Sequence, residues 1–138
     1  MNIDWLLGHT CTDVTATTEY STSFQFGDAN FQVETLWRIS LDGNLRRVSG
    51  DDGQKYGLSA PIDARAEARD LLGSRTITRV AIDELRGDVS IHLDGGWLLE
   101  FITDSGYEPW QLTAPGRNIV AAAGGGVIEL AAARPNER

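Results

Sequence analysis

Two glutamates, Glu34 and Glu100, are the residues of this sequence whose type and setting best suit chemistry. Each lies in an alternating stretch, on the strand face opposite apolar neighbours such as Val33 and Leu99. If both faces are covered, the two carboxylates approach the centre of the fold, which is a setting for acid–base work. If one face meets water, they are surface charges. With Trp37 they define a possible pocket.

The segment with Tyr107, Glu108 and Trp110 is a second candidate, for binding a partner. Aromatic rings beside a carboxylate are typical anchors of protein interfaces, and Pro109 stiffens the segment between them. The alternative is that Trp110 belongs to the core and Glu108 is simply solvated.

The sequence predicts no metal site, cofactor or catalytic residue. His9 and His92 are the two histidines, and His92 with Asp94 supplies at most two of the three or more ligands that a metal needs. A serine or cysteine nucleophile would need a histidine base, and neither histidine has a suitable context. The run at 124–126 lacks the lysine and hydroxyl residue of a phosphate-binding loop. We therefore do not expect an enzyme on these grounds.

The charge of the chain favours one class of partner. Acidic residues number 20 and basic residues 12, which gives a net charge of -8 at pH 7. Such a field repels nucleic acid and anionic membrane surfaces and favours a basic protein, although a plain acidic, soluble protein has the same composition. Cys11 is the single cysteine, no signal peptide or transmembrane stretch is visible, and we expect a cytoplasmic location.

Strands must position these residues. The stretch 87–112 alternates apolar and polar residues and turns at Asp94-Gly95-Gly96, as a β-meander does. Residues 31–39 are predicted to form one long strand. A helix is predicted at about 61–72, with Pro61 in its first turn, Gly73 as its stop, one stripe packed on the sheet and Arg65 in water.

The two parts of the chain resemble each other. Leu6-Leu7-Gly8 matches Leu71-Leu72-Gly73 at an offset of 65 (71 minus 6), and Val14 matches Val80 at 66 (80 minus 14). This predicts two copies of a meander, at 6–48 and 71–112. The expected fold is mainly β (α+β), with two repeated antiparallel meanders forming a sandwich or partly closed barrel. One domain is expected over 1–133, followed by a disordered tail at 134–138.

A resemblance to a known family follows from the order of four segments, SFQFGDANFQVETLWRIS, GDVSIHLDGGWLLEF, GYEPWQL and PGRNIVAAAGGGVIEL. They resemble a family of small bacterial proteins known as a domain of unknown function. These are patterns of strand and turn, so the resemblance implies a fold and no active site. In size and composition the chain is also similar to the immunity proteins that neutralise toxins between bacteria.

The leading hypothesis is a non-catalytic, cytoplasmic protein-binding module, of which an immunity-type protein is one form, for a basic partner. One alternative is a small-ligand-binding barrel or an enzyme that uses the paired glutamates Glu34 and Glu100. Another is a structural homo-oligomer, such as a homodimer. An exposed aromatic patch favours the first, a closed pocket with both glutamates the second, and a self-complementary patch the third.

Overall fold

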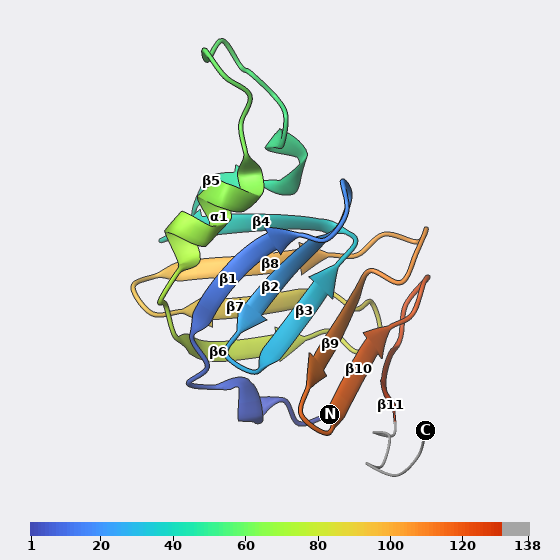
Figure 1. Cartoon of the computed structure of the whole chain (residues 1–138). Helices are drawn as coiled ribbons and strands as arrows, with labels where there is room; N and C mark the ends of the chain where they lie inside the picture. Colours follow the sequence, from blue (N-terminus) through green and yellow to red (C-terminus); the bar gives the residue numbers. More distant parts are fainter. Residues whose placement is uncertain (131–138) are drawn as a thin grey trace.

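The computed structural model describes residues 1–130, which form a sandwich of two antiparallel β-sheets (Figure 1). The expected mainly β fold with one α-helix is confirmed. Because the two sheets are separate, the fold is a sandwich and not the partly closed barrel. The predicted tail at 134–138 and the last residues of the predicted domain, 1–133, lie outside the described residues.

The larger sheet has the strand order β1-β2-β3-β9-β10-β11 and contains Cys11–Ala16 (β1), Thr22–Phe26 (β2), Ala29–Val33 (β3), Trp110–Ala114 (β9), Arg117–Ala121 (β10) and Val127–Leu130 (β11). The smaller sheet has the order β5-β4-β8-β7-β6 and contains Leu36–Leu41 (β4), Asn44–Val48 (β5), Ile77–Ile82 (β6), Val89–Leu93 (β7) and Trp97–Ile102 (β8). The helical elements of the described chain are Asp4–Leu6 (η1), Ser49–Asp51 (η2) and Ala64–Leu72 (α1).

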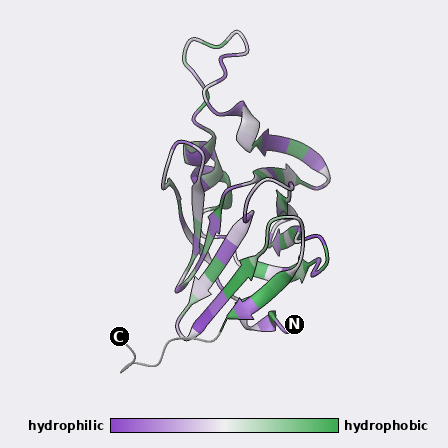
Figure 2. Ribbon diagram, turned by 90° about the vertical axis from the view of Figure 1, so that its right-hand side faces the viewer, coloured by the Kyte–Doolittle hydropathy of each residue, from purple (hydrophilic) through white to green (hydrophobic). Residues whose placement is uncertain are grey.

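The core lies between the sheets. Buried and partly exposed residues alternate along β2, β3, β7 and β8, so hydrophobic and hydrophilic residues mix along individual strands (Figure 2). Phe101 lies at the centre, with its ring centroid 5.4 Å from that of Phe24 and 5.2 Å from that of Phe31. The predicted core is confirmed, because six residues chosen from the alternation are each at most 2% exposed: Phe26, Val33, Trp37, Leu93, Leu99 and Phe101.

The expected long strand at 31–39 is wrong, because the chain changes sheet in its middle. Val33 ends β3 in the larger sheet, and β4 begins at Leu36 in the smaller one. The corner is fixed by Glu34, whose N–H donates to the carbonyl of Pro109 at 2.8 Å, and by Thr35, whose hydroxyl donates to the carbonyl of Ile102 at 2.5 Å. Burial still alternates through the corner, which is why the sequence pattern conceals it.

The two sheets share one plan. In each sheet, three consecutive strands lie beside a hairpin from the other part of the chain. In the larger sheet β1-β2-β3 lie beside the hairpin β9-β10, and in the smaller sheet β6-β7-β8 lie beside the hairpin β4-β5. Val14 lies opposite Phe24 in one sheet, and Val80 lies opposite Ile91 in the other. Thr10 and Thr76, at the starts of β1 and β6, form an isolated bridge. An internal duplication of 6–48 and 71–112 stays a prediction.

Helix α1 is shorter than the predicted helix at about 61–72. It begins after Asp63, whose carboxylate accepts a hydrogen bond from the N–H of Ala66 at 3.0 Å, so Pro61 lies before the helix. The buried stripe consists of Ala64, Ala68 and Leu72, spaced four residues apart. Arg65 was expected in water, but its side chain is only 16% exposed. Its long aliphatic stem and hydrogen bonds allow that burial.

An arm, residues 53–62, connects η2 to α1 and projects away from both sheets (Figure 1). At its base Gly53 N–H donates to Ile62 O, and Ile62 N–H donates to Gln54 O, both at 2.8 Å. Tyr56 and Leu58, farther out, are 67% and 57% exposed. The arm is therefore closed at its base and carries apolar side chains in solvent.

Cys11 is expected to react slowly while the protein is folded. Its side chain is buried, and burial raises the pKa of its thiol from 9.0 to about 11. At pH 8 this lowers the thiolate fraction by a factor of about 100, before any loss of access is counted. Reaction with a thiol-specific chromogenic disulfide, followed at pH 8 in buffer and in denaturant, measures the difference. Equal rates in the two solutions would contradict the burial of this thiol.

Candidate functional site

A groove of about 860 Å³ opens at the end of the sandwich where β1 and β3 finish. It lies between the β1–β2 loop, the β3–β4 corner, η2, the first turn of α1 and the loop before β9. The residues that give it chemical character are Glu19, Tyr20, Glu34, Asp52, Arg65 and Tyr107. The groove brings together residues from distant parts of the chain, including members of both predicted sites.

A shared hydroxyl forms part of the groove's floor. Thr22 Oγ1 accepts from Trp37 Nε1 at 3.2 Å and from Arg65 Nε at 3.1 Å. Trp37 is only 2% exposed, so its ring belongs to the core even though it lines the groove. Trp37, a residue of the predicted pocket, therefore lines the groove as a buried core side chain.

Arg65 ties the walls of the groove together. One guanidinium nitrogen donates to the backbone carbonyl of Glu19 at 2.7 Å, and another lies 3.6 Å from Asp52 Oδ2. With its bond to Thr22, this side chain joins α1 to the β1–β2 loop, to β2 and to the base of the arm. Arg65 was missed as a site residue because its sequence pattern is that of an ordinary exposed helix position.

Exposed aromatic rings line the groove. Tyr20 is 80% exposed and Tyr107 is 70% exposed, and Leu36 between them in sequence is also exposed. Tyr107 and Glu34 also line a smaller side cavity of about 310 Å³ that includes Glu108. Tyr20 was not among the predicted site residues. The sequence feature that could have identified Tyr20 is its position as a single large ring within the polar run at 17–21.

Carboxylates dominate the charge of the groove and side cavity. Their acidic lining residues are Glu19, Glu34, Asp52 and Glu108, whereas Arg65 is the single basic one among the described residues. Glu34 accepts a hydrogen bond from Ser21 Oγ at 2.9 Å, which orients one of its oxygens. The combination of carboxylates and exposed rings suits a cationic ligand.

The base of the arm is held by a charge network around Asp51. This carboxylate accepts from Val48 N–H at 3.1 Å, from the Tyr56 hydroxyl at 2.9 Å and from Arg47 at 3.2 Å. Arg47 also bonds Glu67 of α1 at 2.6 Å. Burial raises the pKa of Asp51, but these hydrogen bonds outweigh it, and the pKa lies below its ordinary value of 3.8.

Acid should therefore loosen the base of the arm. A carboxylate with a lowered pKa stabilises the fold above the pKa of the unfolded chain, and this stability is lost as the pH falls through the folded value. We expect Asp51→Asn to lower the free energy of unfolding by about 1–3 kcal/mol at pH 7, and by less as the pH falls below roughly 4. Urea titrations across that range measure both. A difference that stays constant with pH would contradict the role of the ionised carboxylate.

Glu34 and Glu100 do not form a pair. Glu100 lies on β8 and accepts from Arg38 Nε, its cross-strand neighbour on β4, at 2.9 Å. Glu34 lies at the corner after β3 and faces the groove, which Glu100 does not line. The predicted pocket of Glu34, Trp37 and Glu100 is thus corrected: two members share the groove, and the third is a salt-bridged strand residue.

Trp110 is part of the core and also lines the side cavity. It is 1% exposed, and its Nε1 donates to Gly87 O at 2.6 Å. Tyr107 and Glu108 are exposed and belong to the groove and its side cavity. The predicted surface of Tyr107, Glu108 and Trp110 is corrected in one respect: Tyr107 and Glu108 are exposed, whereas Trp110 is a buried wall of the side cavity.

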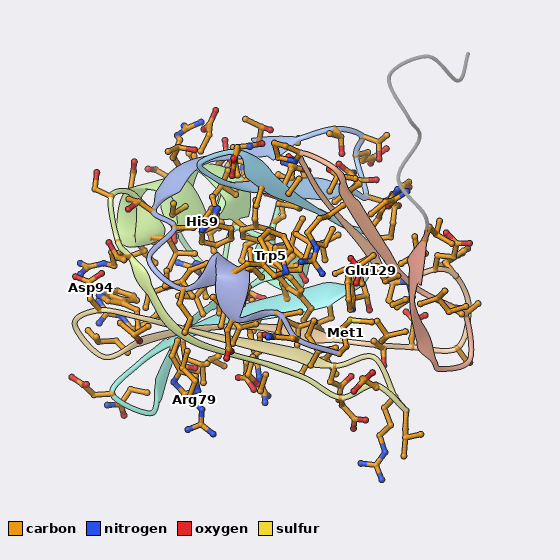
Figure 3. The ribbon with its side chains drawn as sticks, turned by 90° about the horizontal axis from the view of Figure 1, so that it is seen from below. Met1, Trp5, His9, Arg79, Asp94 and Glu129 are labelled. Atoms are coloured by element: carbon orange, nitrogen blue, oxygen red, sulfur yellow. The ribbon has the colours of Figure 1, made fainter. Side chains whose placement is uncertain are left out.

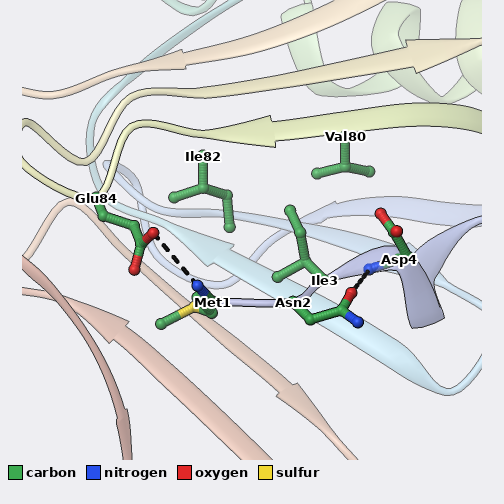
Figure 4. A pocket seen from close by; sticks show the side chains of 7 residues that line it. All are labelled: Met1, Asn2, Ile3, Asp4, Val80, Ile82 and Glu84. Carbon is green, nitrogen blue, oxygen red and sulfur yellow. Dashed lines mark hydrogen bonds and ion pairs between the residues drawn. The ribbon is translucent and has the colours of Figure 1, made fainter.

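A second group of side chains lies at the opposite end of the sandwich. Trp5 lies there, with the Arg117 guanidinium 4.8 Å from its ring centroid, and Arg117 forms two hydrogen bonds to Glu129 (Figure 3). Trp5 Nε1 is buried without a partner in the described part of the chain. A cavity of about 490 Å³ nearby contains the Met1 ammonium, 3.4 Å from Glu84, with apolar side chains around it (Figure 4).

Residues 1–130 contain neither a converging set of metal ligands nor a membrane-spanning helix. No three histidine, cysteine, aspartate or glutamate side chains converge there as a metal site would require. His9 pairs with Asp28, with His9 Nε2 3.0 Å from Asp28 Oδ1, and His92 lies on β7. No helix in these residues is long and apolar enough to cross a bilayer.

Comparison with known proteins places the chain in a family. The sequence profile of a family of unknown function, DUF6188, matches residues 2–132. The chain belongs to the DUF6188 family. Searches of curated proteins and of solved structures found no match. The expected resemblance to a domain of unknown function is confirmed. Bacterial origin and the immunity analogy stay predictions, and the DUF6188 description carries no activity to transfer to this groove.

Proposed function

We propose that this protein is a non-catalytic binding module that holds a basic part of a partner protein in the groove. The observation that carries the proposal is the exposure of Tyr20 and Tyr107 along a groove of about 860 Å³ that also presents Glu34. Large exposed rings are costly to leave in water, and tyrosine is enriched among residues that anchor partners.

Electrostatics supports a basic partner. The net charge of -8 steers cations toward the whole molecule, and the four carboxylates of the groove and side cavity concentrate that attraction. Arg65 offsets only one of them and is already engaged by Thr22 and Asp52. Association should therefore slow as the salt concentration rises, because screening weakens the steering.

The same features argue against the other functions. Phosphate backbones and anionic lipids would be repelled, so neither nucleic acid nor a membrane surface is a suitable partner. An enzyme with paired glutamates lacks its geometry, because Glu34 and Glu100 lie on different surfaces. A homodimer would bring two strongly acidic copies together. In the cytoplasmic, immunity-type form of the proposal, the basic partner is a toxin.

Charge reversal in the groove tests the proposal. We expect Glu34→Lys with Glu108→Lys to weaken partner binding about 10-fold or more, because two carboxylates become repulsive cations. Asp4→Lys with Asp70→Lys changes the net charge equally and provides the control. Asp4 is exposed in η1 and Asp70 is exposed on α1, and neither lines the groove or its side cavity.

Capture from a lysate of the source cell identifies partners, and reconstitution with each purified candidate measures its affinity. Support requires a basic protein that the wild type and the control variant retain and the groove variant loses, with binding that weakens in salt. All variants must first show the wild-type circular dichroism spectrum and melting temperature. Retention by the groove variant at the wild-type affinity would refute the assignment of this surface.

A further inference from the structure

The groove shares lining residues with a cavity on each of its flanks. It shares Glu34 and Tyr107 with the side cavity of about 310 Å³ on one flank. On the other flank it shares Asp52 and Arg65 with an arm cavity of about 460 Å³, which lies between the arm, α1 and β1. Three cavities joined by common walls suit a chain that crosses them in turn more than a single compact ligand.

The end of an edge strand borders the arm cavity. At the start of this strand, the backbone of Cys11 is bonded to Ser74 and Arg75. Strand β1 is the edge of the larger sheet, since β2 is its one neighbour among the described strands. Just beyond β1, Thr17 N–H donates to Ser21 O. Because backbone groups alternate in direction along an antiparallel strand, those of Val14 and Ala16 point away from β2. These two residues line the arm cavity.

The outward N–H of Val14 is already occupied. It donates to the carboxylate of Asp13 at 2.9 Å. Val14 is fully buried, so a partner cannot reach its carbonyl. Ala16 is exposed, and its N–H and carbonyl have no backbone partner outside the strand ladder in the described chain. The outward N–H and carbonyl of this one edge residue can form the two backbone bonds of an antiparallel pair with a short extended segment.

The charges along these cavities set the chemistry of that segment. The arm cavity contributes two charged residues that do not line the groove, Asp63 and Arg69. Over the three cavities the acidic lining residues are Glu19, Glu34, Asp52, Asp63 and Glu108, and the basic ones are Arg65 and Arg69. Successive side chains of an extended segment point to opposite faces, so cationic residues at every second position would all face one side.

We propose that the groove takes an extended, basic polypeptide segment, which pairs with the edge of β1 at Ala16 and continues past Tyr20 and Tyr107. This inference rests on the proposed function and specifies the form of the partner. The pairing supplies affinity through backbone bonds, and the carboxylates select lysine and arginine side chains.

A labelled twelve-residue peptide of alternating lysine and threonine is the probe, with a glutamate–threonine peptide of equal length as its counterpart. Fluorescence anisotropy should show salt-sensitive binding of the lysine peptide and none of the glutamate peptide. Ala16→Pro removes the outward N–H without removing a bond to β2, and proline is tolerated at such edge positions. We expect this variant to bind the lysine peptide at least 10-fold more weakly.

Amide hydrogen exchange gives a second readout on the wild type, which does not depend on the folding of the proline variant. Saturating lysine peptide should slow exchange at Ala16. Binding of the peptide to Ala16→Pro within about twofold of the wild type, or unchanged exchange at Ala16, overturns the inference. So does the absence of peptide binding. If a purified basic partner is nevertheless lost by the Glu34 and Glu108 variant, the proposed function stands and the extended segment alone is refuted.

Discussion

Replacing Phe101 with alanine is expected to lower the free energy of unfolding by about 3–5 kcal/mol. Its side chain is fully buried, and its ring packs against two rings of the facing sheet, Phe24 on β2 and Phe31 on β3. Truncation removes the transfer free energy of the ring and leaves a cavity between two sheets that cannot both move inward. Urea unfolding at neutral pH, followed by tryptophan fluorescence, measures the loss.

Ile102→Ala on the same strand is the control for Phe101. Ile102 follows Phe101 on β8 and lies on the partly exposed face, so its truncation should cost about 1 kcal/mol or less. A loss below roughly 1 kcal/mol for Phe101→Ala would mean that the inner face of β8 has been assigned wrongly.

Replacing Trp110 with alanine should cost a similar amount, about 3–5 kcal/mol. The indole packs against Phe31 with ring centroids 5.8 Å apart, and its N–H satisfies the carbonyl of Gly87 at 2.6 Å. Alanine leaves both a cavity and an unpaired buried carbonyl. Thermal unfolding monitored by circular dichroism would record the loss as a lower melting temperature.

Two further variants separate the causes at Trp110. Trp110→Phe keeps most of the ring volume but loses the N–H donor, so it should cost an intermediate amount. Tyr107→Ala, three residues away but 70% exposed, should change stability by no more than about 0.5 kcal/mol. If Trp110→Ala and Tyr107→Ala lowered the stability by equally small amounts, the assignment of Trp110 to the core would be wrong.

The strands were largely predictable because their signals are local. Alternation identified both faces of β7 and β8, and turn residues such as Asp94-Gly95-Gly96 marked the hairpin between them. The change of sheet after Val33 was not predictable from the same signals. Residues on both sides of the corner point inward, so the pattern at 31–39 is that of one uninterrupted strand.

The groove was predictable only in pieces. Two separate hypotheses each identified part of it: the pocket hypothesis gave Glu34 and Trp37, and the partner-binding hypothesis gave Tyr107 and Glu108. The fold brings members of both to one place. Arg65 could not be identified, because its role depends on acceptors at Glu19 and Thr22 that lie over 40 residues away in sequence. Local patterns record which face a residue occupies, whereas such pairings are set by the path of the whole chain.

The exchange of hairpins between the sheets bears on how the chain folds. Neither sheet can be completed by one part of the chain. In the smaller sheet β4 pairs with β8, which comes much later in sequence, and in the larger sheet β9 pairs with the early strand β3. A nascent chain that ends before β6 would expose the unpaired edges of β3 and β4, which are templates for aggregation. Many native contacts are therefore distant in sequence, so folding should be slow for a domain of this size and cooperative across both sheets. The same connectivity would allow two chains at high concentration to trade hairpins and assemble as an intertwined dimer.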